Sequence, residues 1–256
     1  MAIRADEILK EIEKYELAWD WHTHTTFSHG KGSIEDNVKE AIRKGLESIA
    51  ISDHGPGHLT YGVRRKDLPV MRAEIDRLQA VYPEIRIYLS VEANVIERAP
   101  YVDVTEEDLR YLDFLIAGYH YGIPHGHCVG NWLDAHRALP EGAGRKLLVK
   151  NTDMTLRCIY ENDLRILTHP GDKGRFDIGA IAKACAERDV LMEINMKHPK
   201  LDAAGIRTAM KEDVRFVISS DAHVVRNVGI FEGGLSRALE AGLDPARIVN
   251  IRRKDR

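Results

Sequence analysis

The residues that can do chemistry in this chain are histidines and carboxylates, and they recur where short apolar runs end. His22 and His24 follow the run Ala18–Trp21. Alternate residues of a strand point to the same side, so these two imidazoles can bind one ion. The chain has 12 histidines in 256 residues, and histidine is the most common metal ligand. One His-X-His pair is weak evidence by itself, so the elements that carry the other candidates decide its meaning.

Seven apolar runs are predicted to be strands. They are Ala18–Trp21, Ser48–Ile51, Ile85–Val91, Phe114–Gly118, Arg165–Thr168, Val190–Ile194 and Arg215–Ser219. Most are rich in Ile, Leu and Val on both faces, which favours buried parallel strands. Segments with helical periodicity lie between them, such as Ile34–Lys44 and Leu68–Val81. This alternation predicts βαβ units and one α/β domain over residues 1–256, with a length that suits a barrel.

Every predicted strand places a His, Asp or Glu at its carboxyl end. The sequences there are DWHTH, SDHG, VEAN, GYH, THP, EIN and SSDAH. In a parallel barrel these ends meet at one rim, where active sites lie. The repeated ligand chemistry therefore predicts one metal centre at the C-terminal face. Its nitrogen-rich donors suit Zn, Mn, Fe or Ni better than Mg.

Taken together, these motifs resemble the PHP (polymerase and histidinol phosphatase) superfamily. HTHTTFSHGKGS, ISDHGPGH, VEAN, GYH, THP, EIN and SSDAH follow the family's order from about Asp20 to His223. The resemblance implies a distorted TIM-like barrel of about seven βα units, (β/α)7. It also implies phosphoester hydrolysis with up to three metal ions at the C-terminal face.

The resemblance further implies a ligand set for two or three divalent ions, with Zn, Mn or Fe expected. The groups are His22, His24 and Asp221 for one ion, Glu92, His120 and His169 for a second, and His29, His54 and His223 for a third. Glu92 would bridge the first two ions. His29 departs from the family pattern, because many members have Asp where this chain has His in FSHG. The exchange keeps a ligand but replaces an anionic oxygen with a neutral nitrogen.

The predicted reaction is in-line attack on phosphorus by a hydroxide that bridges two metal ions. Glu92, Asp221 and His198 are the predicted catalytic residues, with His198 as proton donor to the leaving group. Each of three further residues leaves two interpretations open. Asp53 and Asp20 either orient an imidazole or satisfy the backbone of a turn. Glu193 either acts near the metals or helps to close the barrel.

A phosphate dianion needs positive charge nearby. Arg64, Lys173 and Arg226 lie a few residues beyond predicted ligands and are the predicted substrate contacts. Lys197 is one of several further candidates on the same rim. The segment Tyr119–Pro140, rich in Gly and His, is predicted to be a mobile lid over the substrate.

Composition narrows the function. Lys+Arg 37 against Asp+Glu 40 gives a net charge of -3, which argues against a polybasic nucleic-acid arm. Three cysteines without a CxxC motif argue against a disulfide scaffold and favour a reducing compartment. An amphipathic helix is expected at about residues 4–17, and no apolar run is long enough to span a membrane. We therefore expect a cytoplasmic protein.

The leading prediction is a stand-alone phosphoesterase that acts on a small phosphomonoester, in the manner of histidinol phosphatases. The first alternative is a nuclease or nucleotide phosphodiesterase. It is less favoured because the charge is balanced and aromatic residues make up only 7% of the chain. The second alternative is a non-catalytic metal-binding interaction domain. Such a domain is expected to have lost ligands, whereas every expected position here holds one. The sequence does not predict the oligomeric state.

Overall fold

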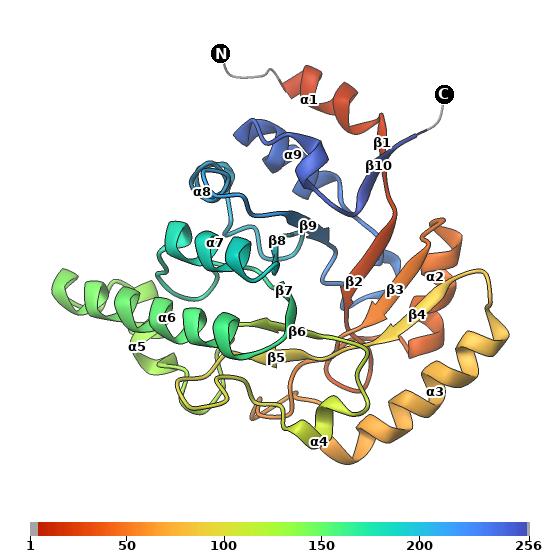
Figure 1. Ribbon diagram of the computed structural model, residues 1–256, viewed down its shortest axis with the longest axis horizontal. Coiled ribbons are helices and arrows are strands. Elements are labelled where there is room, and N and C mark those ends of the chain that lie inside the picture. The colour runs from red at the N-terminus through yellow and green to blue at the C-terminus, as the bar shows by residue number, and fades with distance from the viewer. Residues whose placement is uncertain (1–4, 255–256) are drawn as a thin grey trace.

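The computed structural model of the protein describes residues 5–254 and shows an α/β fold built on two parallel sheets (Figure 1). The first sheet consists of β2 (Trp19–Thr23), β3 (Ser48–Ile51) and β4 (Arg86–Leu89), in this order. The second consists of β5 (Glu92–Asn94), β6 (Leu115–Gly118), β7 (Leu164–Leu167), β8 (Leu191–Asn195) and β9 (Phe216–Ser219).

The predicted α/β class and the seven predicted strand positions agree with the structure to within a few residues. One run differs, because Ile85–Val91 holds only β4, which ends at Leu89, and a separate strand, β5, begins directly after the run at Glu92. β4 pairs with β3, whereas β5 pairs with β6, so a single segment of chain passes from one sheet to the other. The parallel pairing thus forms two sheets, and a closed seven-stranded barrel is not shown.

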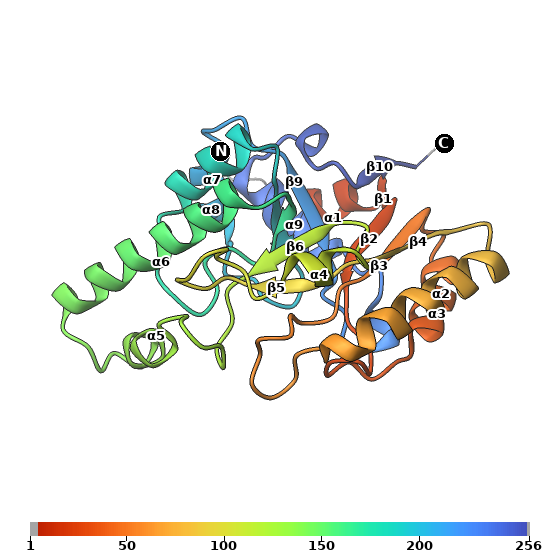
Figure 2. The same ribbon diagram turned by 60° about the horizontal axis from the view of Figure 1, so that its bottom comes forward.

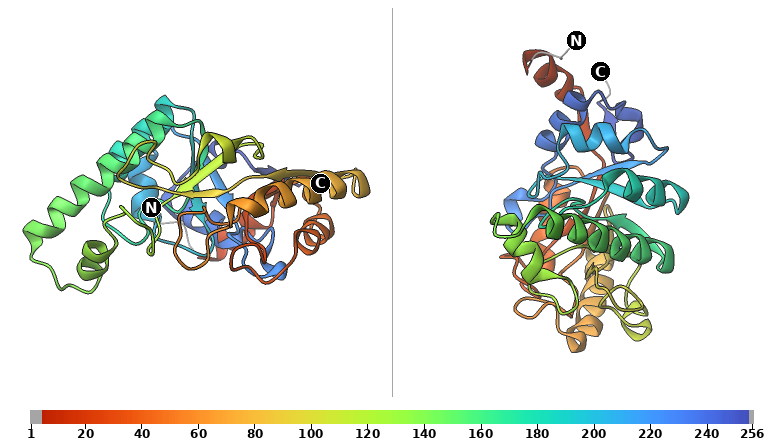
Figure 3. Two further views of the ribbon diagram at one scale, coloured as in Figure 1. Left: turned by 90° about the horizontal axis from the view of Figure 1, so that it is seen from below. Right: turned by 90° about the vertical axis from the view of Figure 1, so that its left-hand side faces the viewer.

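Helices lie on the outside of the two sheets (Figures 2 and 3). They are α2 (Ile34–Arg43), α3 (Leu68–Val81), α4 (Glu106–Leu109), α5 (Cys128–Ala135), α6 (Glu141–Glu161), α7 (Ile178–Glu187), α8 (Ala203–Ala209) and α9 (Glu232–Ala241). Helices α6, α7, α8 and α9 pack successively against one another beside the second sheet, while α2 and α3 pack beside the first. Short 3₁₀ turns span Arg65–Asp67, Val225–Asn227 and Pro245–Arg247.

Local sequence explains how α2 begins and ends. The Ser33 hydroxyl accepts a hydrogen bond from the Asp36 amide, and the Asp36 carboxylate accepts one from the Ser33 amide. This capping box satisfies two amides at the start of the helix. Gly45 ends the helix with a φ of 74°, a conformation that glycine adopts without strain. The cap fixes the end of the loop that carries His29.

The N-terminal segment differs from the expected helix at residues 4–17. Helix α1 covers Ala5–Ile12, and the predicted start at residue 4 lies outside the described residues. Tyr15–Leu17 forms strand β1, which pairs antiparallel with β10 (Ile251–Arg253). In β1 the two end residues are buried and the middle one is half-exposed, a period of two that fits a strand and no longer fits a helix.

The segment Tyr119–Pro140 is more ordered than a structureless loop. It contains α5, and α5 and α6 project together from the body of the molecule (Figure 2). The buried Asn131 amide donates hydrogen bonds to the Tyr119 hydroxyl and to the side-chain oxygen of Asn151. These bonds tie α5 to the end of β6 and to α6. No helix within residues 5–254 is long and apolar enough to cross a membrane.

Candidate metal centre

The strand-end histidines and carboxylates converge at the carboxyl ends of the parallel strands. Three groups of side chains each place their ligand atoms within 4.8 Å of one another. The groups are His22, His24 and Asp221, then His54, Glu92 and His120, then His24, His54 and His223. Seven of the nine predicted metal ligands are therefore in these groups, and the shared members join them into one centre.

Glu92 lies at the middle of this centre and is fully buried. Its Oε1 atom is 2.7 Å from His169 Nε2 and 3.3 Å from His120 Nε2. Its Oε2 atom is 2.9 Å from His54 Nδ1 and 3.3 Å from His22 Nε2. Burial alone raises the pKa of the Glu92 carboxyl, but the surrounding imidazoles hold that pKa well below its usual range. The side chain is therefore an anion with each oxygen facing a different pair of histidines.

Asp221 is the second carboxylate of the centre. Its Oδ1 atom lies 3.2 Å from His24 Nε2 and 3.2 Å from His223 Nδ1. Its backbone adopts a φ of 51°, a strained conformation for a residue other than glycine. Burial raises the pKa of Asp221, but His22 and the other imidazoles outweigh burial and lower it well below its usual range. Asp221 is therefore an anionic side chain on a strained backbone.

Two side chains outside the ligand groups orient the imidazoles. His22 Nδ1 is 2.7 Å from Glu193 Oε1, and His120 Nδ1 is 2.8 Å from Asn94 Oδ1. Each contact leaves the Nε2 atom of the ring facing Glu92. Glu193 Oε2 also accepts a hydrogen bond from the His169 amide at 2.7 Å. Of the two interpretations of Glu193, the structure supports the one near the metals, where such groups fix the ring and its tautomer.

Asp53 and Asp20 have structural roles in the backbone around the centre. Asp53 accepts hydrogen bonds from the Thr25 amide, the Thr25 hydroxyl and the Ser28 hydroxyl, so it holds the loop that carries His29. Asp20 accepts from the amides of Ser220 and Gly229. Both carboxylates satisfy turns, which is the second of the interpretations considered for them.

His29 lies beside the third group of ligands. Its ring centroid is 4.1 Å from that of His223 and 4.9 Å from that of His54, although its nitrogens do not belong to the group. Burial lowers the pKa of His29 to about 4 and that of His24 to about 3. Both rings are therefore neutral near pH 7, and a neutral ring has the lone pair that a metal ion needs.

Unsatisfied buried atoms show that the donor set fits divalent cations. Eight buried side-chain atoms of the centre make no hydrogen bond within the described part of the chain. They are His22 Nε2, both ring nitrogens of His24, His54 Nδ1, Glu92 Oε2, His120 Nε2, His169 Nδ1 and Asp221 Oδ1. Leaving such atoms without a partner costs free energy. His54 Nδ1 and Glu92 Oε2 approach to 2.9 Å without hydrogen-bond geometry, as two ligands of one cation would.

The remaining predicted site residues divide into two sets. His198 lies in the centre, with Nε2 at 3.6 Å from Asp221 Oδ2, and its Nδ1 is 3.0 Å from Asp172 Oδ2. Lys173 Nζ is 2.5 Å from the same Asp172 atom. By contrast, the Arg64 side chain is 70% exposed and donates to Asp67 at 2.6 Å. Arg226 is exposed in the turn that precedes Val228. Neither arginine contacts one of the predicted metal-ligating residues in the described part of the chain.

Sequence reasoning gave no role to Tyr61 and Asp172, and it ranked Lys197 below other cations. The Tyr61 ring lies 4.2 Å from that of His29 and 3.6 Å from that of His58. Lys197 Nζ is 3.0 Å from His223 Nδ1 and Nε2. Lys197 follows the EIN motif by two residues, which is a signal in the sequence. Tyr61 and Asp172 depend on loop conformations that no local pattern specifies.

Comparison with known proteins agrees with this geometry. Residues 20–197 match the profile of the PHP domain, so the chain belongs to the PHP domain family. A relative from Caldanaerobacter subterraneus subsp. tengcongensis, named a "probable phosphatase", is 30% identical over 94% of this chain and 89% of its own length. Another "probable phosphatase", from Acetivibrio thermocellus, is 28% identical over 83% of this chain and 82% of its own.

A solved structure shares the fold. Histidinol phosphate phosphatase from Lactococcus lactis, complexed with zinc, L-histidinol and phosphate, superposes with a TM-score of 0.61. Its sequence is 19% identical, and the match covers 89% of this chain and 94% of that one. Family membership and the donor set together define the protein as a metal-dependent phosphoesterase.

Proposed function

We propose that the protein hydrolyses a small phosphomonoester with two or three divalent ions, of which Zn, Mn or Fe fit best. The observation that carries the proposal is the position of Glu92, whose two oxygens each face a separate pair of imidazoles. One carboxylate between two sets of nitrogen ligands suits adjacent cations. The phosphatase names of the relatives and the phosphate in the Lactococcus complex support the choice of substrate class.

The ions would be held by the nine predicted ligands, with His29 joining His54 and His223. When bound, they supply Lewis-acid activation of water and neutralise charge on phosphoryl oxygens. The protein's own contribution is the fixed direction of the imidazoles, set by Glu193 and Asn94. Burial of the ligands also keeps bulk water away, which strengthens electrostatic interactions inside the centre.

His198 would give a proton to the leaving oxygen. Its Nδ1 faces Asp172 at 3.0 Å, so the carboxylate holds the ring and leaves Nε2 toward the centre. The Asp172 carboxylate is in turn held by Lys173, and its pKa is lowered to below its usual range by His198 and Lys173 against the effect of burial. The Asp172 carboxylate would thus fix the His198 ring beside the centre, as a general acid requires.

Lys197 and Lys173 supply positive charge for the phosphate. Lys197 Nζ now contacts the His223 ring and lies 4.0 Å from Asp221 Oδ1. An ammonium group donates only, so its contact uses the lone pair of His223 that a cation would take. With His223 bound to a cation, the Lys197 ammonium is free to meet a phosphoryl oxygen. Arg64 and Arg226 remain predictions from the sequence, without a contact that supports them.

Replacing Lys197 with methionine is expected to raise KM for p-nitrophenyl phosphate about tenfold, because one charge-assisted contact to phosphate is lost. Steady-state kinetics with metal-loaded protein measure the change. Lys211→Met, which removes an exposed lysine near the end of α8, is the matched control and is expected to match the wild type. An unchanged KM in Lys197→Met, with Arg226→Met raising KM instead, would assign the phosphate contact to Arg226.

The reaction class is tested with a substrate panel and protein loaded with Mn or Zn. We expect release of phosphate from p-nitrophenyl phosphate and from small alkyl phosphomonoesters. Bis-p-nitrophenyl phosphate, a diester, is expected to react at least about tenfold more slowly, because its second ester group leaves one negative charge for the cations and lysines to bind, where a monoester dianion has two. Faster turnover of the diester would favour a phosphodiesterase. No turnover of any of these substrates by fully metal-loaded protein would contradict the proposed phosphoesterase activity.

We also infer that the two sheets form one distorted barrel of seven βα units in a single domain over residues 1–256. The segment from β4 to β5 belongs to both sheets. On the other side, the buried Asn250 amide donates to the carbonyls of Trp19 in β2 and Ile218 in β9. A parallel bridge between Thr23 and Ala222 lies at the carboxyl ends of the same strands. These contacts support a closed barrel, although β2 and β9 do not form a continuous ladder of backbone hydrogen bonds.

A further inference from the structure

A pocket lies at the amino ends of the strands, on the face opposite the metal centre. Its lining includes Phe114, directly before β6, and Asp163, directly before β7. The metal ligands His120 and His169 follow the carboxyl ends of the same two strands. The pocket has a volume of about 440 Å³, within the range of about 300–1,000 Å³ that is usual for small-molecule sites. Because it lies at the opposite ends of these strands, the pocket is separate from the metal centre.

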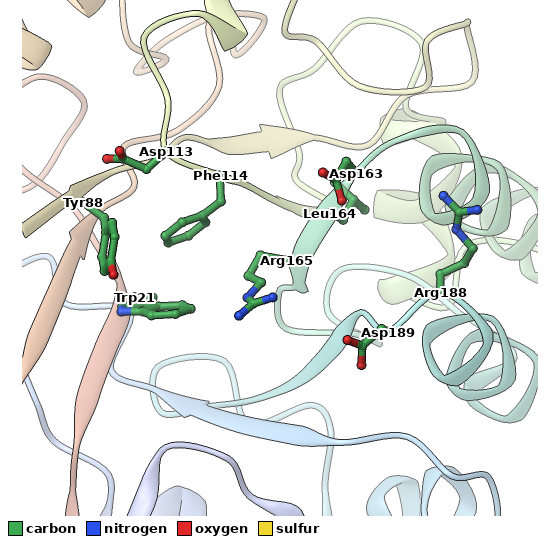
Figure 4. Close-up of a pocket in the computed structure, with 9 residues that line it drawn as sticks. All are labelled: Trp21, Tyr88, Asp113, Phe114, Asp163, Leu164, Arg165, Arg188 and Asp189. Atoms are coloured by element: carbon green, nitrogen blue, oxygen red, sulfur yellow. The ribbon is translucent and has the colours of Figure 1, made fainter.

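One wall of the pocket is aromatic. The rings of Trp21, Tyr88 and Phe114 form a cluster with centroids 4.9 to 5.6 Å apart. Trp19 stacks on Trp21, with the two ring centroids 3.9 Å apart. Figure 4 shows the three rings on one side of the pocket and Asp163, Arg188 and Asp189 on the other, with Arg165 between. The wall is a rigid apolar surface for a flat ring.

The centre of the pocket is positively charged. Arg165 is exposed in a strand whose other residues are buried, and its guanidinium lies 5.7 Å from the Trp21 ring. Within residues 5–254, no carboxylate comes within 4.0 Å of the guanidinium of Arg165 or Arg188. Such arginines bind planar anions well, because their donors match carboxylate and phosphate oxygens.

The three aspartates that line the pocket do not cancel this charge. Asp113 is paired with Arg72 at 2.9 Å, and Asp189 is paired with Arg215. Asp163 is exposed at the rim and has no such partner in the described part of the chain. Two arginines therefore face one unpaired carboxylate, which leaves a net positive charge of one in the pocket.

We propose that this pocket binds a planar aromatic anion, with the ring against Trp21 and Phe114 and the anionic group on the guanidinium of Arg165. The ligand class is an aromatic ring of one or two fused cycles with a carboxylate or phosphate group. The strand β2 links the pocket to the metal centre, because Trp21 directly precedes the ligand His22. The proposal does not depend on the reaction at the other face.

The test uses 2-naphthoate and 2-naphthylphosphonate as probes, since neither is a phosphoester. The protein is the full chain with Trp132 replaced by phenylalanine, which leaves Trp19 and Trp21 as its tryptophans. Because Trp21 lines the pocket and Trp19 stacks on Trp21, bound probe is expected to change their fluorescence saturably. The titration is made on the metal-loaded protein and repeated after the metal is removed with a chelator, so that probe binding at the metal centre is recognised by its loss. A stronger response to one probe tells whether the site prefers carboxylate or phosphonate.

Variants decide the geometry. Arg165→Gln is expected to weaken the binding of the preferred probe about tenfold, the loss of one charge-assisted contact. Asp163→Asn is expected to tighten it, and Arg145→Gln, an exposed arginine in α6, is the matched control. Thermal unfolding verifies that each variant is folded. Absence of saturable binding, equal binding of neutral 2-naphthalenemethanol, or an Arg165→Gln variant with unchanged affinity would each overturn the proposal.

Discussion

Glu92→Gln is expected to lower phosphoester turnover by at least about a hundredfold and to lower metal content as well. Glu92 is fully buried and contacts imidazoles with both oxygens. Glutamine keeps the shape but removes the anion and turns one end of the side chain into a donor, which cannot bind a cation. Loss of groups that merely orient metal ligands already costs about 10–100-fold, and removal of a ligand costs more.

Elemental analysis and steady-state kinetics on the same preparation measure this effect. Glu84→Gln, which makes the same change at an exposed position outside the centre, is the matched control and is expected to resemble the wild type. Glu92→Gln protein that binds the full complement of metal would contradict the role of Glu92 as a link between two ions. Full turnover would contradict any role for it in the reaction.

Glu193→Gln is the second large effect, and it tests orientation. Glu193 accepts from His22, from the His169 amide and from the Asn195 side chain. A glutamine side chain has only one accepting oxygen. Its NH2 group would face a hydrogen-bond donor where the second carboxylate oxygen now accepts. We expect a loss of turnover of about 10–100-fold together with a weaker affinity for metal, as for other groups that orient metal ligands.

The distinction between Glu193 and Glu92 is quantitative. Because Glu193 is not a ligand, Glu193→Gln is expected to regain much of its activity at high metal concentration, whereas Glu92→Gln is not. Metal titration of activity gives both the apparent affinity and the maximal rate. Glu193→Gln that stays inactive at saturating metal, with normal unfolding, would mean that Glu193 acts on substrate directly.

Most of the fold and most of the ligand set could be predicted because their signals are local. Buried parallel strands appear as apolar runs, and the carboxyl ends of such strands meet at one edge. His120 and His169 were found in this way, each directly or soon after a run of apolar residues. His22 and His24 were found by the period of two. These patterns need no knowledge of loops.

The parts that sequence did not predict depend on contacts between distant segments. The break after Leu89 follows from pairing with two different neighbours, β3 and β6, which no single run encodes. Asp53 was ambiguous because its partners, Thr25 and Ser28, lie in another loop. The positions of long cationic side chains were the hardest to predict. Arg64 and Lys197 both lie in segments between strands, but only Lys197 contacts a predicted metal ligand.

The most direct test of the central claim is an anomalous-difference map from crystals of the protein loaded with zinc. We predict at least two peaks beside Glu92, one within about 2.0–2.2 Å of each carboxylate oxygen, with nitrogens of His22 and His169 at similar distances from separate peaks. Peaks that avoid Glu92, or a single ion held without this carboxylate, would contradict a metal centre built around it.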